Sequence, residues 1–315
     1  MERLMARPDA GVGLVGGAGV IASLKAYLRR GLDPRVFQIL FLGSFLTIGV
    51  LVRDFSVMWQ QVALTFTAAL ATQAWWLARL KLWRAGFLSA IVTSFGLSIL
   101  VRAENFWVHP LIAMLAISSK FIVRIDDRHV FNPANLGAIL AAYVLPGAWI
   151  SPGQWGQDVL LAAWFIVLGT IVTQRSRRLD IGWCFLVFYL GLIAMRVLTL
   201  GQLLQVITHQ LQNGALLLFA FFMISDPLTT PRNTWARIGF TALVALGAYE
   251  WQYYMIKPNG LVVSLFALTP LVIGLNRWFP GPKFHWRPLA QPESAVHATD
   301  PRPIAAGEGM AIKHR

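Results

Sequence analysis

The sequence predicts an all-α fold: a polytopic helical membrane protein with about ten transmembrane helices and both termini in the cytoplasm. Composition is the first support, because the 315-residue chain is 57% hydrophobic and only 13% charged, whereas soluble domains carry about 25% charged residues. The second is that apolar runs long enough to cross a bilayer recur along most of the chain. The third is the placement of lysine and arginine between those runs.

We expect three regions along the chain. Residues 1–35 form a basic cytoplasmic segment and residues 36–280 form the transmembrane domain. Residues 281–315 contain several prolines and few large apolar side chains, so we expect a disordered cytoplasmic tail. The ten expected spans are, in chain order, 36–52, 57–78, 86–101, 106–119, 134–150, 157–174, 181–200, 212–225, 237–256 and 259–279.

The distribution of basic residues predicts the orientation of these spans. Cytoplasmic loops of membrane proteins are enriched in lysine and arginine. With both termini inside, 23 of the 27 lysines and arginines fall in cytoplasmic segments and three in outer loops. The remaining one, Arg196, falls within a span. The net charge of +13 is therefore interpreted as a topological signal, and we do not expect nucleic acid as a partner.

Two polar interruptions carry the functional signal. The first, SSKFIVRIDDRHVFNPANLG, covers 118–137, and the second, ISDPLTTPRN, covers 224–233. Both lie on the predicted cytoplasmic side. Each contains a proline after a small polar residue, at Asn132-Pro133 and Asp226-Pro227, and the residue before a proline disfavours helix. Broken backbone near a membrane is tolerated where it is buried in protein or lines a polar cavity.

These interruptions permit more than one interpretation. Exposed amides with the hydroxyls of Ser225, Thr229 and Thr230 suit an anion or a polar ring edge. The side-chain amides of Asn132 and Asn135 suit a flavin-like or quinone-like ring. The simpler alternative is an ordinary helix–loop–helix connection in which asparagine and aspartate cap the helices.

Three cations with a spacing of four residues precede the first break: Lys120, Arg124 and Arg128. On a helix this spacing places them on one face. That face could hold a phosphate or attract an acidic partner, or it could be only a positively charged cytoplasmic stripe.

The two interruptions together resemble a known family. The strings SK-x3-R-x4-HVFNPANLG and FMISDPLTTPRN are similar to those of the NqrB/RnfD family, whose members are membrane components of the sodium-pumping NADH:quinone reductase and of the Rnf electron-transport complex. The similarity covers about residues 105–280. It implies a ten-helix protein of the inner membrane that carries flavin and passes electrons across the bilayer, coupled in the complete pumps to movement of Na⁺ or H⁺.

The resemblance also implies a site and a cofactor. Family members attach FMN to a threonine in a Ser-Gly-Ala-Thr motif, which does not occur here, so we expect a reduced or stand-alone relative with a non-covalent flavin, either FMN or riboflavin. Asn132 and Asn135 would bond the ring edge, and Thr229 and Thr230 would bond a ribityl or phosphate group. Lys120 or Arg124 would stabilise the reduced, anionic ring. The complete candidate set is Lys120, Arg124, Asn132, Pro133, Asn135, Ser225, Asp226, Thr229 and Thr230.

Other motifs limit what the chain does alone. It contains no dinucleotide fingerprint, Walker loop or zinc spacing, and its one cysteine cannot ligate an iron–sulfur cluster. We therefore expect electrons to come from a redox partner protein or other membrane subunits, with quinone as a candidate acceptor, and no catalysis by this chain alone. Two alternatives remain open: a transporter or channel for an ion, flavin or other small solute, and a scaffold protein without cofactor.

Overall fold

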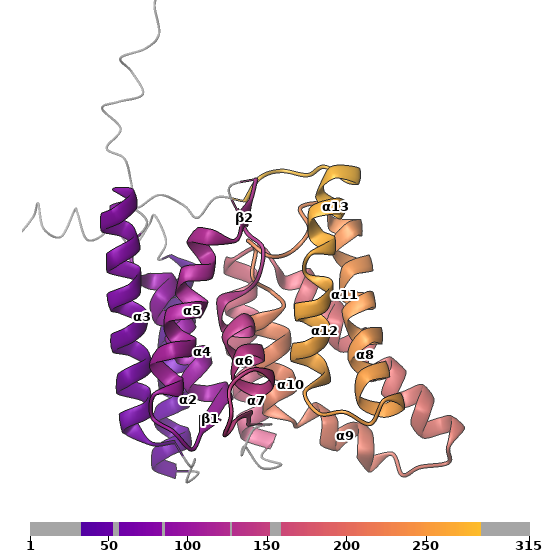
Figure 1. Ribbon diagram of the computed structural model, residues 1–315. Helices are drawn as coiled ribbons and strands as arrows, with labels where there is room; N and C mark the ends of the chain where they lie inside the picture. The colour runs from indigo at the N-terminus through magenta and orange to yellow at the C-terminus, as the bar shows by residue number, and fades with distance from the viewer. Residues whose placement is uncertain (1–32, 53–56, 84–85, 127, 152–158, 285–315) are drawn as a thin grey trace, which may run out of the picture. The chain divides into compact units, whose positions relative to one another are not determined.

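The computed structural model describes residues 33–52, 57–83, 86–126, 128–151 and 159–284. These residues are mostly helical, which confirms the all-α part of the predicted fold class (Figure 1). The predictions for residues 1–32 and 285–315 lie outside the described part of the chain. The chain divides into two units, and the helices and strands described below belong to the unit from Pro34 to Phe284.

Helices coincide with all ten of the expected apolar runs. The first half contains α2 (Pro34–Val52), α3 (Trp59–Leu80), α4 (Leu88–Leu100), α5 (Val108–Ile122) and α6 (Pro133–Tyr143). The second half contains α7 (Val159–Arg175), α8 (Leu179–Thr199), α9 (Gln205–Leu211), α10 (Gly214–Leu218), the π-helix η2 (Phe219–Met223), α11 (Thr234–Tyr249), the π-helix η3 (Glu250–Tyr254), α12 (Gly260–Leu268) and α13 (Leu271–Trp278).

Length and composition qualify a smaller number of these helices as membrane spans. Among the described residues, α2 and α8 are long and apolar enough to cross a membrane. Two bent pairs also qualify if each is taken as one span: Gln205–Leu211 with Gly214–Met223, and Gly260–Leu268 with Leu271–Trp278, each bent by 50°. The structure thus supports two to four membrane-spanning elements on this criterion.

The structure corrects two predicted helices. The expected span 134–150 ends early, because α6 stops at Tyr143 and Ala148–Ile150 forms the strand β4. This strand pairs antiparallel with β1 (Val101–Ala103). The spacing of Lys120, Arg124 and Arg128 does not form a helical face either, because α5 ends at Ile122. Beyond it, β2 (Arg124–Ile125) and β3 (Arg128–His129) form a short antiparallel hairpin.

The packing of the helices repeats between the two halves. In the first half α2 packs on α4, α3 on α4 and α5, and α5 on α6. In the second half α7 packs on α10 and η2, α8 on η2 and α11, and α11 on α12. The halves meet where α6 contacts α12 and α2 contacts α7. Close approach of α11 and α12 requires a glycine, since a Cβ at Gly260 would lie 2.6 Å from the carbonyl oxygen of Ala248.

Candidate functional site

The two polar interruptions meet at one end of this helical unit. In Figure 1 the β2–β3 hairpin lies at the same end as α13, while β1 lies at the opposite end. Arg128 connects the interruptions directly, because its Nη2 donates hydrogen bonds to the carbonyl oxygens of Pro227 at 2.6 Å and Thr230 at 2.9 Å. A guanidinium group therefore satisfies two carbonyls that the proline-containing turn leaves without helical partners.

Asp226 is the centre of the second interruption. Its Oδ1 accepts a hydrogen bond from the backbone N–H of Leu228 at 3.0 Å. Its Oδ2 lies 3.4 Å from His129 Nε2 and accepts a bond from Asn132 Nδ2 at 3.3 Å. Burial alone would raise the pKa of Asp226. The hydrogen bond and charge of His129, the Leu228 N–H and the charge of Arg128 together outweigh burial, so the pKa lies below its ordinary value.

The hydroxyl groups beside Asp226 are used within the protein. Thr230 Oγ1 donates to the Asp226 carbonyl oxygen at 3.0 Å, and Thr229 Oγ1 donates to the same atom at 3.4 Å. Ser225 Oγ donates to the carbonyl oxygen of Phe221 in the preceding π-helix. These bonds fold the segment into a compact turn, and of the three hydroxyl residues Thr229 lines a pocket.

The asparagines of the first interruption hold α6 in place. Asn132 caps the helix by accepting hydrogen bonds from the N–H groups of Ala134 and Asn135, and Pro133 occupies the first turn, where its missing N–H is not needed. Asn135 is 1% exposed, and its Nδ2 donates to the Val262 carbonyl oxygen at 3.0 Å and to Met223 Sδ at 3.3 Å. Both amides thus bind protein groups, as the capping interpretation predicts.

Lys120 and Arg124 are not hydrogen-bonded to the other candidates in the described part of the chain, although the charge of Lys120 lies within electrostatic reach of Asp226. Lys120 is buried in α5, where its Nζ donates to Gln73 Oε1 at 2.9 Å and Ser89 Oγ at 3.0 Å. It therefore joins α5 to α3 and α4. Arg124 lies in β2 with an exposed side chain.

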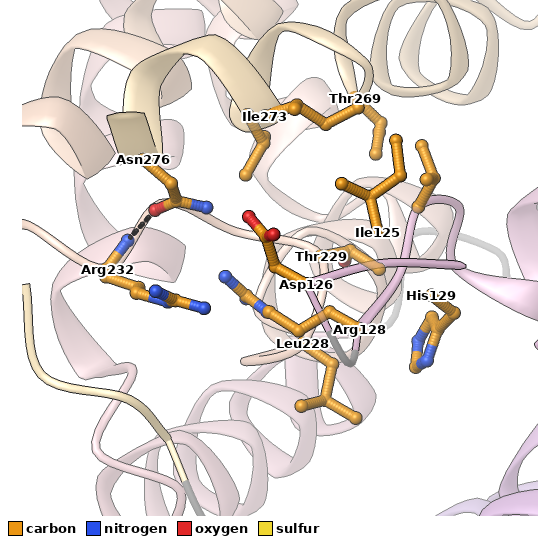
Figure 2. Close-up of a pocket in the computed structure, with 12 residues that line it drawn as sticks. Ile125, Asp126, Arg128, His129, Leu228, Thr229, Arg232, Thr269, Ile273 and Asn276 are labelled. Atoms are coloured by element: carbon orange, nitrogen blue, oxygen red, sulfur yellow. Dashed lines mark hydrogen bonds between the residues drawn. The ribbon is translucent and has the colours of Figure 1, made fainter. Parts of the chain in front are cut away.

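A pocket lies between the hairpin, the second interruption and α13. It contains about 350 Å³ of empty space, open solvent included. Figure 2 shows Arg128 and Arg232 extending toward each other across it, with the Asp126 carboxylate beside them. The residues that line it are Ile125, Asp126, Arg128, His129, Val130, Leu228, Thr229, Arg232, Thr269, Val272, Ile273 and Asn276.

The site contains arginines that the sequence analysis assigned only to the positive cytoplasmic bias. Arg232 lines the pocket, and its backbone N–H donates to Asn276 Oδ1 at 2.8 Å. Arg237 pairs with Asp180, with Nη2 and Oδ2 2.6 Å apart. Arg178 is 6% exposed, and burial together with the charge of Arg237 lowers its pKa to about 10. The sequence could have placed these arginines near the site, because they lie at the starts of α8 and α11. Helix ends on the same side of a membrane lie at a similar depth.

Electrostatics at the site favour an anionic ligand. Burial lowers the pKa of Arg128 and repulsion from Arg232 lowers it further, and together they outweigh the opposite effect of Asp226 and Asp126. A negative group in the pocket would relieve both effects, since a nearby anion favours the charged form of a guanidinium. Among the described residues, no group of three or more histidine, cysteine, aspartate or glutamate side chains is arranged to hold a metal ion.

Comparisons with known proteins identify no family for this chain. No protein-family model matches the chain, and a search of curated proteins found no match.

Proposed function

We propose that this chain is a multi-pass protein of the inner membrane, with ten spans and both termini in the cytoplasm, that holds a non-covalent flavin and relays electrons between a partner protein and an acceptor. One observation carries the proposal. The two interruptions that resemble the NqrB/RnfD family lie far apart along the chain, yet Arg128, His129 and Asn132 of the first bond directly to residues of the second that are 94 to 99 positions away.

Exposed apolar side chains support the membrane location. On α2 the side chains of Leu51 and Val52 are 78% and 71% exposed, and on α8 that of Leu198 is 72% exposed. The most apolar stretch of α2 has only 22% of its residues buried within the protein. Water-soluble proteins rarely expose contiguous apolar surface on this scale, whereas a lipid-facing helix does.

The pocket residues fit the anionic part of a flavin. Arg128 and Arg232 would hold the phosphate of FMN or balance the charge of the reduced ring, and Thr229 would bond a hydroxyl of the ribityl chain. Asn132 and Asn135 would act by holding the two interruptions together. When bound, a flavin supplies transfer of one or two electrons.

The absorbance spectrum of detergent-purified protein tests the proposal. We expect flavin absorbance that reducing agent bleaches, and after acid precipitation we expect the colour in the supernatant, because the attachment motif is missing. Colour in the pellet would show covalent attachment and contradict that part of the proposal. A folded but colourless preparation that does not take up added FMN or riboflavin would contradict the cofactor.

Transport of a small solute is a second candidate, favoured by the two bent pairs α9–α10 and α12–α13. Many transporters build substrate sites from interrupted helices near the bilayer centre. Uptake of solute by the purified protein alone in liposomes, in preparations that contain no flavin, would favour this function over electron transfer.

A further inference from the structure

Buried arginine donors without partners surround the pocket. Arg128 Nε and Nη1 and Arg232 Nε are inaccessible to solvent and have no hydrogen-bond partner among the described residues. A guanidinium group offers five donors in one plane, and burying a charged donor without an acceptor is costly. Here three such donors belong to the two arginines that face each other in the pocket. These three donors therefore need oxygen acceptors between the two arginines.

Among the described residues, no carboxylate is hydrogen-bonded to these three donors. Asp226 already accepts bonds from His129, Asn132 and the Leu228 N–H. Asp180 is paired with Arg237. Asp126 lines the pocket and is exposed, and its charge acts on Arg128 without a hydrogen bond to that side chain. Among the described residues that line the pocket, two arginines therefore stand against one carboxylate, that of Asp126.

We propose that the pocket binds a phosphoryl group, with oxygens facing the unpartnered donors of Arg128 and Arg232. A tetrahedral anion offers oxygens to donors on opposite sides, which a single planar carboxylate does less well. The side chains of Thr229 and Asn276 add neutral polar groups to the wall.

Size and surroundings narrow the ligand class. The cavity volume proper is about 30 Å³, room for a few water-sized atoms, so the pocket takes a small anionic group and leaves the rest of a larger molecule outside. The phosphate can belong to FMN, to a lipid headgroup or to free inorganic phosphate. The inference rests on the proposed function only for the first of these sources.

Inorganic phosphate binding to the full chain in phosphatidylcholine nanodiscs tests the inference. The measurement is the melting temperature as phosphate replaces chloride at constant ionic strength. We expect a saturable rise for the wild type, and binding about tenfold weaker for Arg232→Gln, the scale of one lost charge-assisted hydrogen bond. This variant keeps the backbone bonds of residue 232 to Asn276 and Arg237. Arg232→Lys, which keeps the charge, should recover part of the affinity.

Arg277→Gln is the matched control, because Arg277 is an exposed cation next to a pocket residue and does not line the pocket. It should bind phosphate like the wild type. Equal phosphate affinity in Arg232→Gln and Arg277→Gln, or no effect of phosphate beyond that of chloride, would overturn the inference.

Three further titrations identify the source of the phosphate. Tighter binding of FMN than of riboflavin, with the difference lost in Arg232→Gln, assigns the site to the cofactor phosphate. Competition between inorganic phosphate and added phosphatidic acid assigns it to a headgroup. If phosphate binds and neither flavin does, the phosphoryl site stands and the proposed function fails. If FMN and riboflavin bind equally and phosphate does not bind, the phosphoryl site fails and the flavin proposal stands.

Discussion

At the scale of single residues, Asp226 is the group on which the candidate site depends. Its carboxylate accepts bonds from three donors, two of which belong to the other interruption. Asp226→Asn would remove the negative charge opposite Arg128 and His129 and place an amide N–H against existing donors. We expect the free energy of unfolding to fall by roughly 1–3 kcal/mol, the cost of leaving a buried polar group without its partner. Thermal unfolding of the purified protein measures this loss.

The control is Asp126→Asn, the same chemical change at an exposed residue of the same pocket. Asp126 has φ 51, a conformation that asparagine also tolerates, so the change should alter stability by less than about 0.5 kcal/mol. Equal effects at Asp226 and Asp126 would contradict a special role of Asp226.

The same carboxylate gives the difference between wild type and Asp226→Asn a defined dependence on pH. Because the pKa of Asp226 is lowered in the folded state, its stabilisation is complete above the unfolded-state pKa of about 3.9. It is lost as the pH falls through the folded-state pKa. The melting temperatures of wild type and Asp226→Asn should therefore differ by a constant amount near neutral pH and converge below about pH 4.

At the scale of elements, two asparagine caps offer a comparison within one chain. Asn132 caps α6 and Asn233 caps α11, and each side chain accepts hydrogen bonds from the backbone N–H groups two and three residues later. Only Asn132 also donates to Asp226 and to the carbonyl oxygen of Met223. Asn233→Ala should cost about 1 kcal/mol, as a lost cap does. Asn132→Ala should cost about 1 kcal/mol more, because it also breaks the link between the interruptions.

A double-mutant cycle separates the two contributions of Asn132. Asn132→Ala and Asp226→Asn should be non-additive by about 1 kcal/mol, because each removes the same bond. Asn233→Ala and Asp226→Asn should add. Additive losses in both pairs would show that Asn132 acts as a cap alone.

The helices were predictable from sequence because burial in an apolar phase is a local property of each run. The β2–β3 hairpin was not, because a cation every four residues is compatible with a helix, and the alternative depends on bonds from Arg128 to residues of the distant second interruption. The strand pair β1–β4 likewise joins segments from different parts of the chain.

The candidate site was predictable only in part, for the same reason. The prolines and asparagines mark where helices break, and this is visible in sequence. Which groups remain unbonded is a property of the folded chain. Asn135 is engaged by Val262 of α12, whereas Arg232, which the sequence assigns only to the charge bias, retains a buried Nε without a partner among the described residues.

At the scale of the whole molecule, the repeated packing of the two halves bears on the proposed topology. The order α2 to α6 is matched by α7, α8, α10–η2, α11 and α12–α13, with corresponding contacts. Each half thus contains five main helical segments, an odd number, so corresponding segments would cross the membrane in opposite directions. Under the ten-span proposal both interruptions then lie on the cytoplasmic side, with the pocket and its arginines.

Cysteine labelling tests this topology. The chain has one cysteine, Cys184, which is replaced by serine before single cysteines are placed at the exposed positions Arg79 and Gln202. Ten spans with both termini inside place residue 79 in the cytoplasm and residue 202 outside, because this orientation keeps most lysines and arginines inside. A membrane-impermeant maleimide should label Gln202→Cys in intact cells and Arg79→Cys only after permeabilisation. The reverse pattern would invert the chain and place the arginine pocket outside, whereas labelling of both positions from the same side would rule out an odd number of crossings between them. The reverse pattern would thus remove the pocket's access to a cytoplasmic electron donor. Labelling of both positions from the same side would remove the topology on which that access depends.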